Sequence, residues 1–227
     1  MKNNEIISNI FKTLVIILGL IGIFCFNVKN GDLATNFFYY TILTNTVCII
    51  SAAFFLYKDL LHKKYSVSRE NRLNIYKYII TVSIFVVAFT FNFIIFPTAG
   101  FSLTTYGYKN LLLHCLVPIL YIVDWLLFAK KDNLSFKSIS YTLIPFILYL
   151  VLIYGRAFIF KTRIFMGLDV KTPSLYPYFF LDYSRIGFGN FIAFMFVSFI
   201  VIVIVGIILL KVGKIINKKK DNLIVDY

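Results

Sequence analysis

The chain has 227 residues, of which 60% are hydrophobic and only 15% are charged, whereas about half of the residues of a soluble domain are apolar. A transmembrane helix needs about 20 mostly apolar residues, so this composition excludes an ordinary water-soluble domain and indicates a protein with several membrane spans. The net charge of +13 would suit a nucleic-acid-binding protein only if the basic residues gathered on one soluble surface.

Six mostly apolar stretches of span length follow one another, with His114 and Asp124 as polar interruptions inside the fourth. The first stretch is slightly short and extends toward Ile10 if Lys12 snorkels to the headgroup region. The runs are continuous rather than alternating, which favours helices over the strands of a spanning barrel. We therefore predict an all-α, polytopic membrane protein with one domain over 1–227 and spans at 13–28, 37–57, 77–96, 110–129, 138–155 and 189–210.

The basic residues favour alternate connections between these spans. Sixteen of the 23 lie at the N-terminus or after the second, fourth and sixth spans: Lys2, Lys12, Lys58, Lys63, Lys64, Arg69, Arg72, Lys77, Lys130, Lys131, Lys137, Lys211, Lys214, Lys218, Lys219 and Lys220. This bias predicts that both termini are cytoplasmic. Basic groups spread along a membrane surface serve topology and contact anionic lipids, so we expect no nucleic-acid partner.

The first span and the cysteines exclude other classes. No small-x-small cleavage site follows residues 24–27, so we predict a retained first helix rather than a cleaved signal peptide. Cys25, Cys48 and Cys115 all lie inside spans, where an odd number of thiols fits neither a disulfide framework nor a zinc site. We predict packing roles for these thiols, and no metal or organic cofactor.

The outer connection 156–188 is the longest and is rich in aromatic residues, notably over 176–183 (YPYFFLDY). Aromatic rings favour the headgroup level, so we expect this segment to lie over the mouth of the bundle as a cap, with turns at Pro173 and Pro177. An ordinary interfacial aromatic belt is the alternative. The outer connection 97–109 is predicted to be a short, turn-rich connector.

Polar side chains inside the spans are costly and are therefore candidate functional groups. Thr41 and Asn45 share one helical face, together with Thr44. A rise of about 1.5 Å per residue places both Thr41 and His114 roughly 6 Å inside the outer ends of their spans, and Asn92 returns to a similar level. An imidazole can activate a hydroxyl nucleophile, and an amide can orient it or stabilise an oxyanion. Helix-to-helix hydrogen bonding without chemistry remains the alternative.

Asp124 lies elsewhere, roughly 15 Å deeper than His114 at about 1.5 Å per residue, so the two residues cannot form a dyad. We expect Asp124 to reach inner-surface water or a basic partner, and we favour a structural role over a proton relay.

Three motifs resemble those of bacterial "Pr-six-Pr" six-span membrane proteins, and they occur in order between about residues 38 and 190. They are the run 38–45 (FYYTILTN), the run 113–118 (LHCLVP) followed by 124–125 (DW), and the run 176–182 (YPYFFLD). This family is similar in turn to the androgen-induced and androgen-dependent membrane hydrolases, which cleave fatty acid esters of hydroxy fatty acids with an intramembrane threonine and histidine. The chain departs from those hydrolases in the spacing between His114 and Pro118, which is one residue shorter, and at Phe179-Phe180.

The resemblance implies Thr41 as nucleophile and His114 as base of a lipid-ester hydrolase, or of an acyltransferase, in a bacterial plasma membrane. The partners expected are a fatty acyl ester and the bilayer. Asn45, Asn92, Tyr176 and Asp182 are the candidate substrate-binding or oxyanion residues. The alternative is a transporter or receptor for a small solute or lipid that uses the same polar pocket for binding only.

Overall fold

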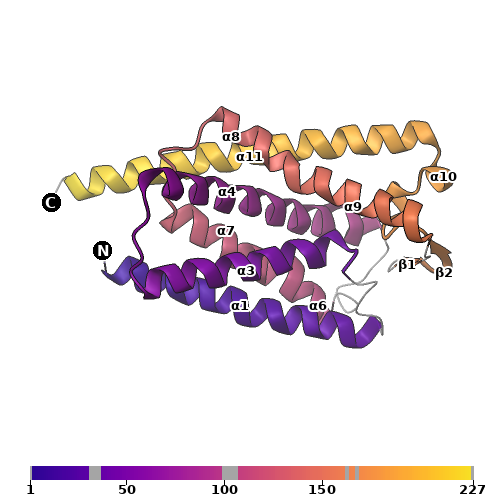
Figure 1. Cartoon of the computed structure of the whole chain (residues 1–227), viewed down its shortest axis with the longest axis horizontal. Coiled ribbons are helices and arrows are strands. Elements are labelled where there is room, and N and C mark those ends of the chain that lie inside the picture. The colour runs from indigo at the N-terminus through magenta and orange to yellow at the C-terminus, as the bar shows by residue number, and fades with distance from the viewer. Residues whose placement is uncertain (1, 31–36, 99–106, 162–163, 167–168, 226–227) are drawn as a thin grey trace.

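The computed structural model describes residues 2–30, 37–98, 107–161, 164–166 and 169–225. Within this part of the chain, six helical spans are long and apolar enough to cross a membrane (Figure 1). Four of their main helices are α1 (Lys2–Asn30), α3 (Tyr40–Leu60), α4 (Val67–Phe89) and α11 (Phe188–Val225). The predicted six-span, all-α architecture is confirmed.

Three spans are built from consecutive helical pieces. The third span is α4 followed by the π-helix η1 (Thr90–Ile95) and α5 (Phe96–Thr98). The fourth span consists of α6 (Gly107–Leu111), the π-helix η3 (Leu112–Leu116) and α7 (Val117–Phe128), and the fifth of α8 (Phe136–Ser140), the 3₁₀-helix η4 (Tyr141–Leu143) and α9 (Ile144–Phe160). Single-turn π segments inside α-helices are frequent at functional sites.

The helices extend beyond the apolar stretches that predicted them. The third span begins at Val67 rather than at residue 77, and α11 continues to Val225 rather than ending near residue 210. Charged residues such as Lys and Glu are good helix formers in water, so a helix does not have to end where its apolar run ends.

The bundle has α4 near its centre, and α4 contributes to two apolar cores. Tyr78 and Val82 pack in the core shared with α9 and α11, whereas Ile80 and Ile84 pack in the core shared with α1, α3 and α7. Both chain termini lie at the same end of the bundle (Figure 1). We call this the proximal end, and the opposite end, which carries α6, α10 and the strands, the distal end.

Two glycines on α1 allow close helix contact. A Cβ atom at Gly19 would lie 2.7 Å from Ile49 Cγ1, and one at Gly22 would lie 2.7 Å from Leu113 Cδ2. Small residues let membrane helices approach each other at the backbone level. Gly22 therefore brings α1 against Leu113, the residue before His114.

The segment after α9 is folded rather than extended. It forms an antiparallel pair of strands, β1 (Ile164–Met166) and β2 (Asp169–Ser174), then the 3₁₀-helix η5 (Phe179–Leu181) and the short helix α10 (Tyr183–Ile186). The strands were not predicted, and Pro173 lies in β2 rather than at a turn. Proline is tolerated in such an edge strand, where one N–H is not needed. Of the predicted connector 97–109, residues 99–106 lie outside the described part of the chain.

A network of buried charges lies nearer the proximal end. Asp124 accepts hydrogen bonds from Lys77 Nζ at 2.5 Å and from Ser8 Oγ at 2.5 Å, and Lys12 Nζ lies 2.8 Å from Asp59 Oδ2. The expected basic partner of Asp124 is therefore Lys77 on α4. The snorkelling predicted for Lys12 is wrong, because its side chain turns into the bundle and stays 5% exposed. Pairing with carboxylates offsets the cost of burying these ammonium groups.

Candidate active site

Thr41 and His114, which the sequence places at the same depth in the membrane, lie in contact at the distal end. Thr41 Oγ1 lies 3.3 Å from His114 Nε2, within hydrogen-bond distance. Thr41 is on the first turn of α3 and half-buried, and His114 is on η3 and 4% exposed. A hydroxyl within hydrogen-bond reach of an imidazole is the arrangement required for general-base activation of a nucleophile.

Pro118 explains how His114 can be held by other helices. Proline has no N–H, so one carbonyl group about one turn before it loses its helical donor, and the N–H of Val117 is used by the Leu112 carbonyl in the π-helix. The Leu113 carbonyl instead accepts from Asn45 Nδ2 at 3.1 Å, and the His114 carbonyl accepts from Asn92 Nδ2 at 2.9 Å. These two bonds fasten η3 to α3 and to η1.

Asn45 and Asn92 have both amide hydrogens engaged. Asn45 Nδ2 also donates to the Thr41 carbonyl at 2.9 Å, and Asn92 Nδ2 also donates to the Ala88 carbonyl at 2.8 Å. A carboxamide has only two N–H donors, so neither side chain has a donor left for an oxyanion in this arrangement. Asn45 binds the backbone of Thr41 and that of Leu113, and therefore sets the separation of the hydroxyl and the imidazole.

The imidazole of His114 is also fixed by an aromatic ring. The ring of Phe91, on η1, stacks on it with a centroid separation of 3.6 Å and an interplanar angle of 13°. The backbone carbonyl of Asn110 interacts with the imidazole, although Nδ1 forms no hydrogen bond of ordinary geometry within the described part of the chain. In the tautomer that carries its proton on Nδ1, Nε2 is the acceptor for the Thr41 hydroxyl group.

An apolar pocket of about 290 Å³ lies directly beside Thr41. Its walls come from α3, α4 with η1, α9, α11 and the segment after β2, and they include Phe91, Phe146, Tyr178, Val201 and Ile202. Apart from Thr41 and a few other hydroxyl groups, the lining is hydrocarbon or aromatic. Such a pocket suits an alkyl chain, with the polar group of a ligand placed at Thr41.

The pocket also reaches the outer surface of the bundle between η1 and α11. Three of its lining residues, Ile94, Phe194 and Val197, expose 44%, 40% and 54% of their surface. In a membrane this surface faces lipid, because both helices belong to apolar spans. The opening is therefore on the side of the bundle from which a lipid can enter.

Tyr178 is a site residue that was not predicted. It lies just before η5, lines the pocket, and forms a hydrogen bond with the Thr41 side chain. Hydrogen bonding from the Thr41 side chain and from the backbone of Tyr40 and Thr41, in the first turn of α3, lowers its pKa. Burial raises the pKa of Tyr178 to about 12, against the lowering effect of these hydrogen bonds, so the phenol keeps its proton at neutral pH.

Two of the predicted candidates lie away from the dyad, in the folded segment after α9. Tyr176 packs on Tyr154 with a centroid separation of 5.1 Å, and Asp182 accepts hydrogen bonds from Ser174 Oγ at 2.7 Å and Ser184 Oγ at 2.6 Å. Burial would raise the pKa of Asp182, but these hydroxyl groups and backbone amides outweigh it and lower the pKa. Both residues thus shape the segment that carries Tyr178.

Arg156 fastens this segment to the bundle. From the last turns of α9 its guanidinium group donates to the Leu175 carbonyl and lies 4.6 Å from the centre of the Phe38 ring. Tyr154, two residues before Arg156 on α9, donates from Oη to the Leu181 carbonyl at 2.7 Å. The predicted position of this segment over the distal end is consistent with these contacts.

The chain matches no protein-family model, no curated protein and no solved structure at a significant level.

Proposed function

We propose that this protein is a membrane-embedded hydrolase of fatty acyl esters, with Thr41 as nucleophile and His114 as general base. The observation that carries the proposal is the 3.3 Å contact between Thr41 Oγ1 and His114 Nε2 at the wall of an apolar pocket. The resemblance of three sequence motifs to those of bacterial "Pr-six-Pr" proteins, a family similar in turn to membrane threonine hydrolases, supports the same pair.

The chemistry follows from these two groups. His114 Nε2 takes the proton of Thr41 while Oγ1 attacks the ester carbonyl, and the tetrahedral intermediate expels the alcohol, which receives that proton. The acyl-threonine is then hydrolysed by a water molecule that His114 deprotonates, and Thr41 regains its proton as the fatty acid leaves. A second alcohol in place of water would make the same protein an acyltransferase.

The negative oxygen of the tetrahedral intermediate needs hydrogen-bond donors. The first turn of a helix has N–H groups without helical acceptors, and its positive dipole end favours an anion. The backbone at Tyr40 and Thr41 forms hydrogen bonds with the Tyr178 hydroxyl. We infer that the ester oxygen displaces this hydroxyl from the N–H groups, and that Tyr178 then donates its proton to the oxyanion.

Replacing Tyr178 with Phe should therefore lower kcat about 100-fold with little change in KM, the usual cost of losing one oxyanion donor. The measurement is steady-state hydrolysis of a fatty acyl ester by the purified protein in detergent micelles. Tyr176→Phe is the matched control, because the Tyr176 ring packs on Tyr154 in the same segment. An unchanged kcat for Tyr178→Phe would exclude Tyr178 as an oxyanion donor.

The apolar pocket is proposed to hold the acyl chain, with its carbonyl group at Thr41. Val201 lies on α11 in the pocket lining, whereas Ile204 on the same helix is 48% exposed on the outer face of the bundle. A tryptophan at position 201 would fill space that a long chain needs.

Val201→Trp should consequently lower kcat/KM for long-chain esters by tenfold or more and leave short-chain esters nearly unaffected. The measurement is kcat/KM over a series of p-nitrophenyl esters of increasing chain length. Ile204→Trp adds the same bulk on the outer face and should leave the series unchanged. An equal loss at every chain length would contradict a role of this pocket in acyl binding.

We also propose that both termini are cytoplasmic, because basic residues are concentrated at the proximal end. The Thr41–His114 pair then lies at the depth of the outer leaflet, and the substrate is an ester that enters sideways from that leaflet.

The direct experiment is to incubate the purified protein with long-chain esters and to quantify released fatty acid. Release that is time-dependent and proportional to protein supports the proposal. Saturable binding of the same lipids without release would instead indicate a binding protein or transporter.

A further inference from the structure

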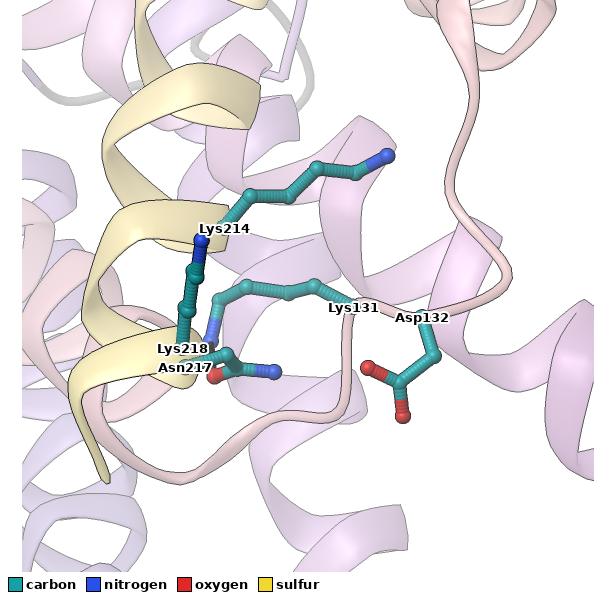
Figure 2. A pocket seen from close by; sticks show the side chains of 5 residues that line it. All are labelled: Lys131, Asp132, Lys214, Asn217 and Lys218. Carbon is teal, nitrogen blue, oxygen red and sulfur yellow. Dashed lines mark hydrogen bonds between the residues drawn. The ribbon is translucent and has the colours of Figure 1, made fainter. Parts of the chain in front are cut away.

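A second, strongly basic pocket lies at the proximal end, far from Thr41. It has a volume of about 380 Å³ and lies between the connection from α7 to α8 and the last turns of α11 (Figure 2). Its lining consists of Lys131, Asp132, Lys214, Asn217 and Lys218. Three of these five side chains are cationic and only one is anionic.

Lys131 is a fixed cation at this site. Its side chain is completely buried, and Nζ donates to the Ala129 carbonyl at 2.7 Å, the Leu126 carbonyl at 3.0 Å and Asn217 Oδ1 at 3.1 Å. These three acceptors are neutral, and the ammonium group also lies 5.0 Å from the centre of the Trp125 ring. A Cβ atom at Gly213 would lie 2.8 Å from Lys131 Cδ, so the glycine leaves room for this side chain on α11.

Lys214 and Lys218 supply two more charges from one face of α11. They are one turn apart, and like charges at this spacing repel each other, which an anion between them would relieve. Within the described part of the chain, no hydrogen bond or ion pair engages either ammonium group. Figure 2 shows Lys214 and Lys218 projecting from α11, and Lys131 and Asp132 on the connection from α7 to α8.

The site lies where the apolar surface of α11 ends. Ile208, Val212 and Ile215 follow one another along a neighbouring face of the same helix and are 52%, 39% and 57% exposed. Membrane-spanning residues exposed in this way contact acyl chains. A ligand with an anionic head and apolar tails would place its head among the lysines and its tails along this face.

We propose that the basic pocket binds the phosphate group of an anionic phospholipid. The bound group is a phosphodiester, which carries one negative charge. Lys214 and Lys218 hold it above the fixed charge of Lys131. Basic pockets between membrane helices at the cytoplasmic side commonly bind such headgroups. This inference does not depend on the Thr41–His114 chemistry.

The test measures the binding of short-chain phosphatidylglycerol to the purified full-length protein in a neutral detergent. The readout is the shift of the protein's thermal unfolding temperature. Phosphatidylglycerol should raise this temperature in a saturable, salt-sensitive manner, and phosphatidylcholine of the same chain length should not. The double variant Lys214→Gln/Lys218→Gln should bind phosphatidylglycerol on the order of 30-fold more weakly, since each lysine near an anionic lipid contributes a factor of roughly five.

The control is Lys63→Gln/Lys64→Gln, which removes two exposed lysines from the connection between α3 and α4 at the same end. This control variant should bind phosphatidylglycerol with the affinity of the native protein. Equal weakening in both double variants, or an equal response to phosphatidylcholine, would overturn the proposal. Saturation by inorganic phosphate at the same concentrations would also overturn it in favour of a free-anion site.

Discussion

Thr41→Ala should abolish ester hydrolysis, because no other group takes the place of Oγ1 beside His114 Nε2. His114→Ala should lower kcat by about 10²–10⁴-fold, the usual contribution of a general base. Residues that act as one catalytic unit are strongly non-additive, so the double variant should be little worse than either single variant. The measurement is fatty acid release by each purified protein.

Thr46→Ala is the matched control for this series. Thr46 lies on the same helix, but its hydroxyl group donates to the Ile42 carbonyl of its own helix at 2.8 Å. The Thr46→Ala variant should retain hydrolytic activity. If the dyad served only to join helices, Thr41→Ala would cost about 0.6 kcal/mol of stability and leave the activity intact. Undiminished hydrolysis by Thr41→Ala would exclude the proposed mechanism.

Asp124→Asn should destabilise the folded protein by about 3–5 kcal/mol, because it leaves Lys77 as an uncompensated buried charge. The ammonium group of Lys77 lies 2.5 Å from Asp124 Oδ2, and both side chains are under 10% exposed. The free energy of unfolding, measured by denaturant titration in mixed micelles, gives this cost.

Two further variants separate the charge effect from a general effect of substitution. Adding Lys77→Met to Asp124→Asn should restore much of the lost stability, since it removes the unpaired charge. Asp132→Asn should have little effect, because that carboxylate is exposed and forms no ion pair within the described residues. Equal stability of Asp124→Asn and the native protein would show that the buried pair is not a structural requirement.

The six spans could be predicted because continuous apolar runs of about 20 residues have few alternatives in a membrane. Their ends could not, since α4 and α11 continue as helices through charged sequence. The strands β1 and β2 carried no clear signal, because strands of three and six residues do not show a long alternating pattern.

The contact of Thr41 with His114 was expected from depth, but depth does not determine which faces of two helices meet. The structure shows why these faces meet: Asn45 and Asn92 bind the Leu113 and His114 carbonyl groups, which lie where Pro118 and the π-helix η3 interrupt the α-helical hydrogen bonds. The sequence contains the necessary signal, since a proline four residues after a histidine always removes the helical donor to the histidine carbonyl.

The role of Tyr178 was missed, and a basic partner of Asp124 was expected but not identified as Lys77. Tyr178 reaches the dyad only because the segment after α9 folds back over α3, which no local pattern reveals. Lys77 and Asp124 lie at similar depths near the same ends of adjacent spans, so the comparison of depths that paired Thr41 with His114 would also have paired them.

The most direct measurement of the central claim is covalent labelling of the purified protein with a long-chain fluorophosphonate, followed by peptide mass spectrometry. We expect one phosphonyl adduct on Thr41 Oγ1 with loss of fluoride, absent in Thr41→Ala and much slower in His114→Ala. No adduct, or an adduct on another residue that persists in Thr41→Ala, would contradict the account.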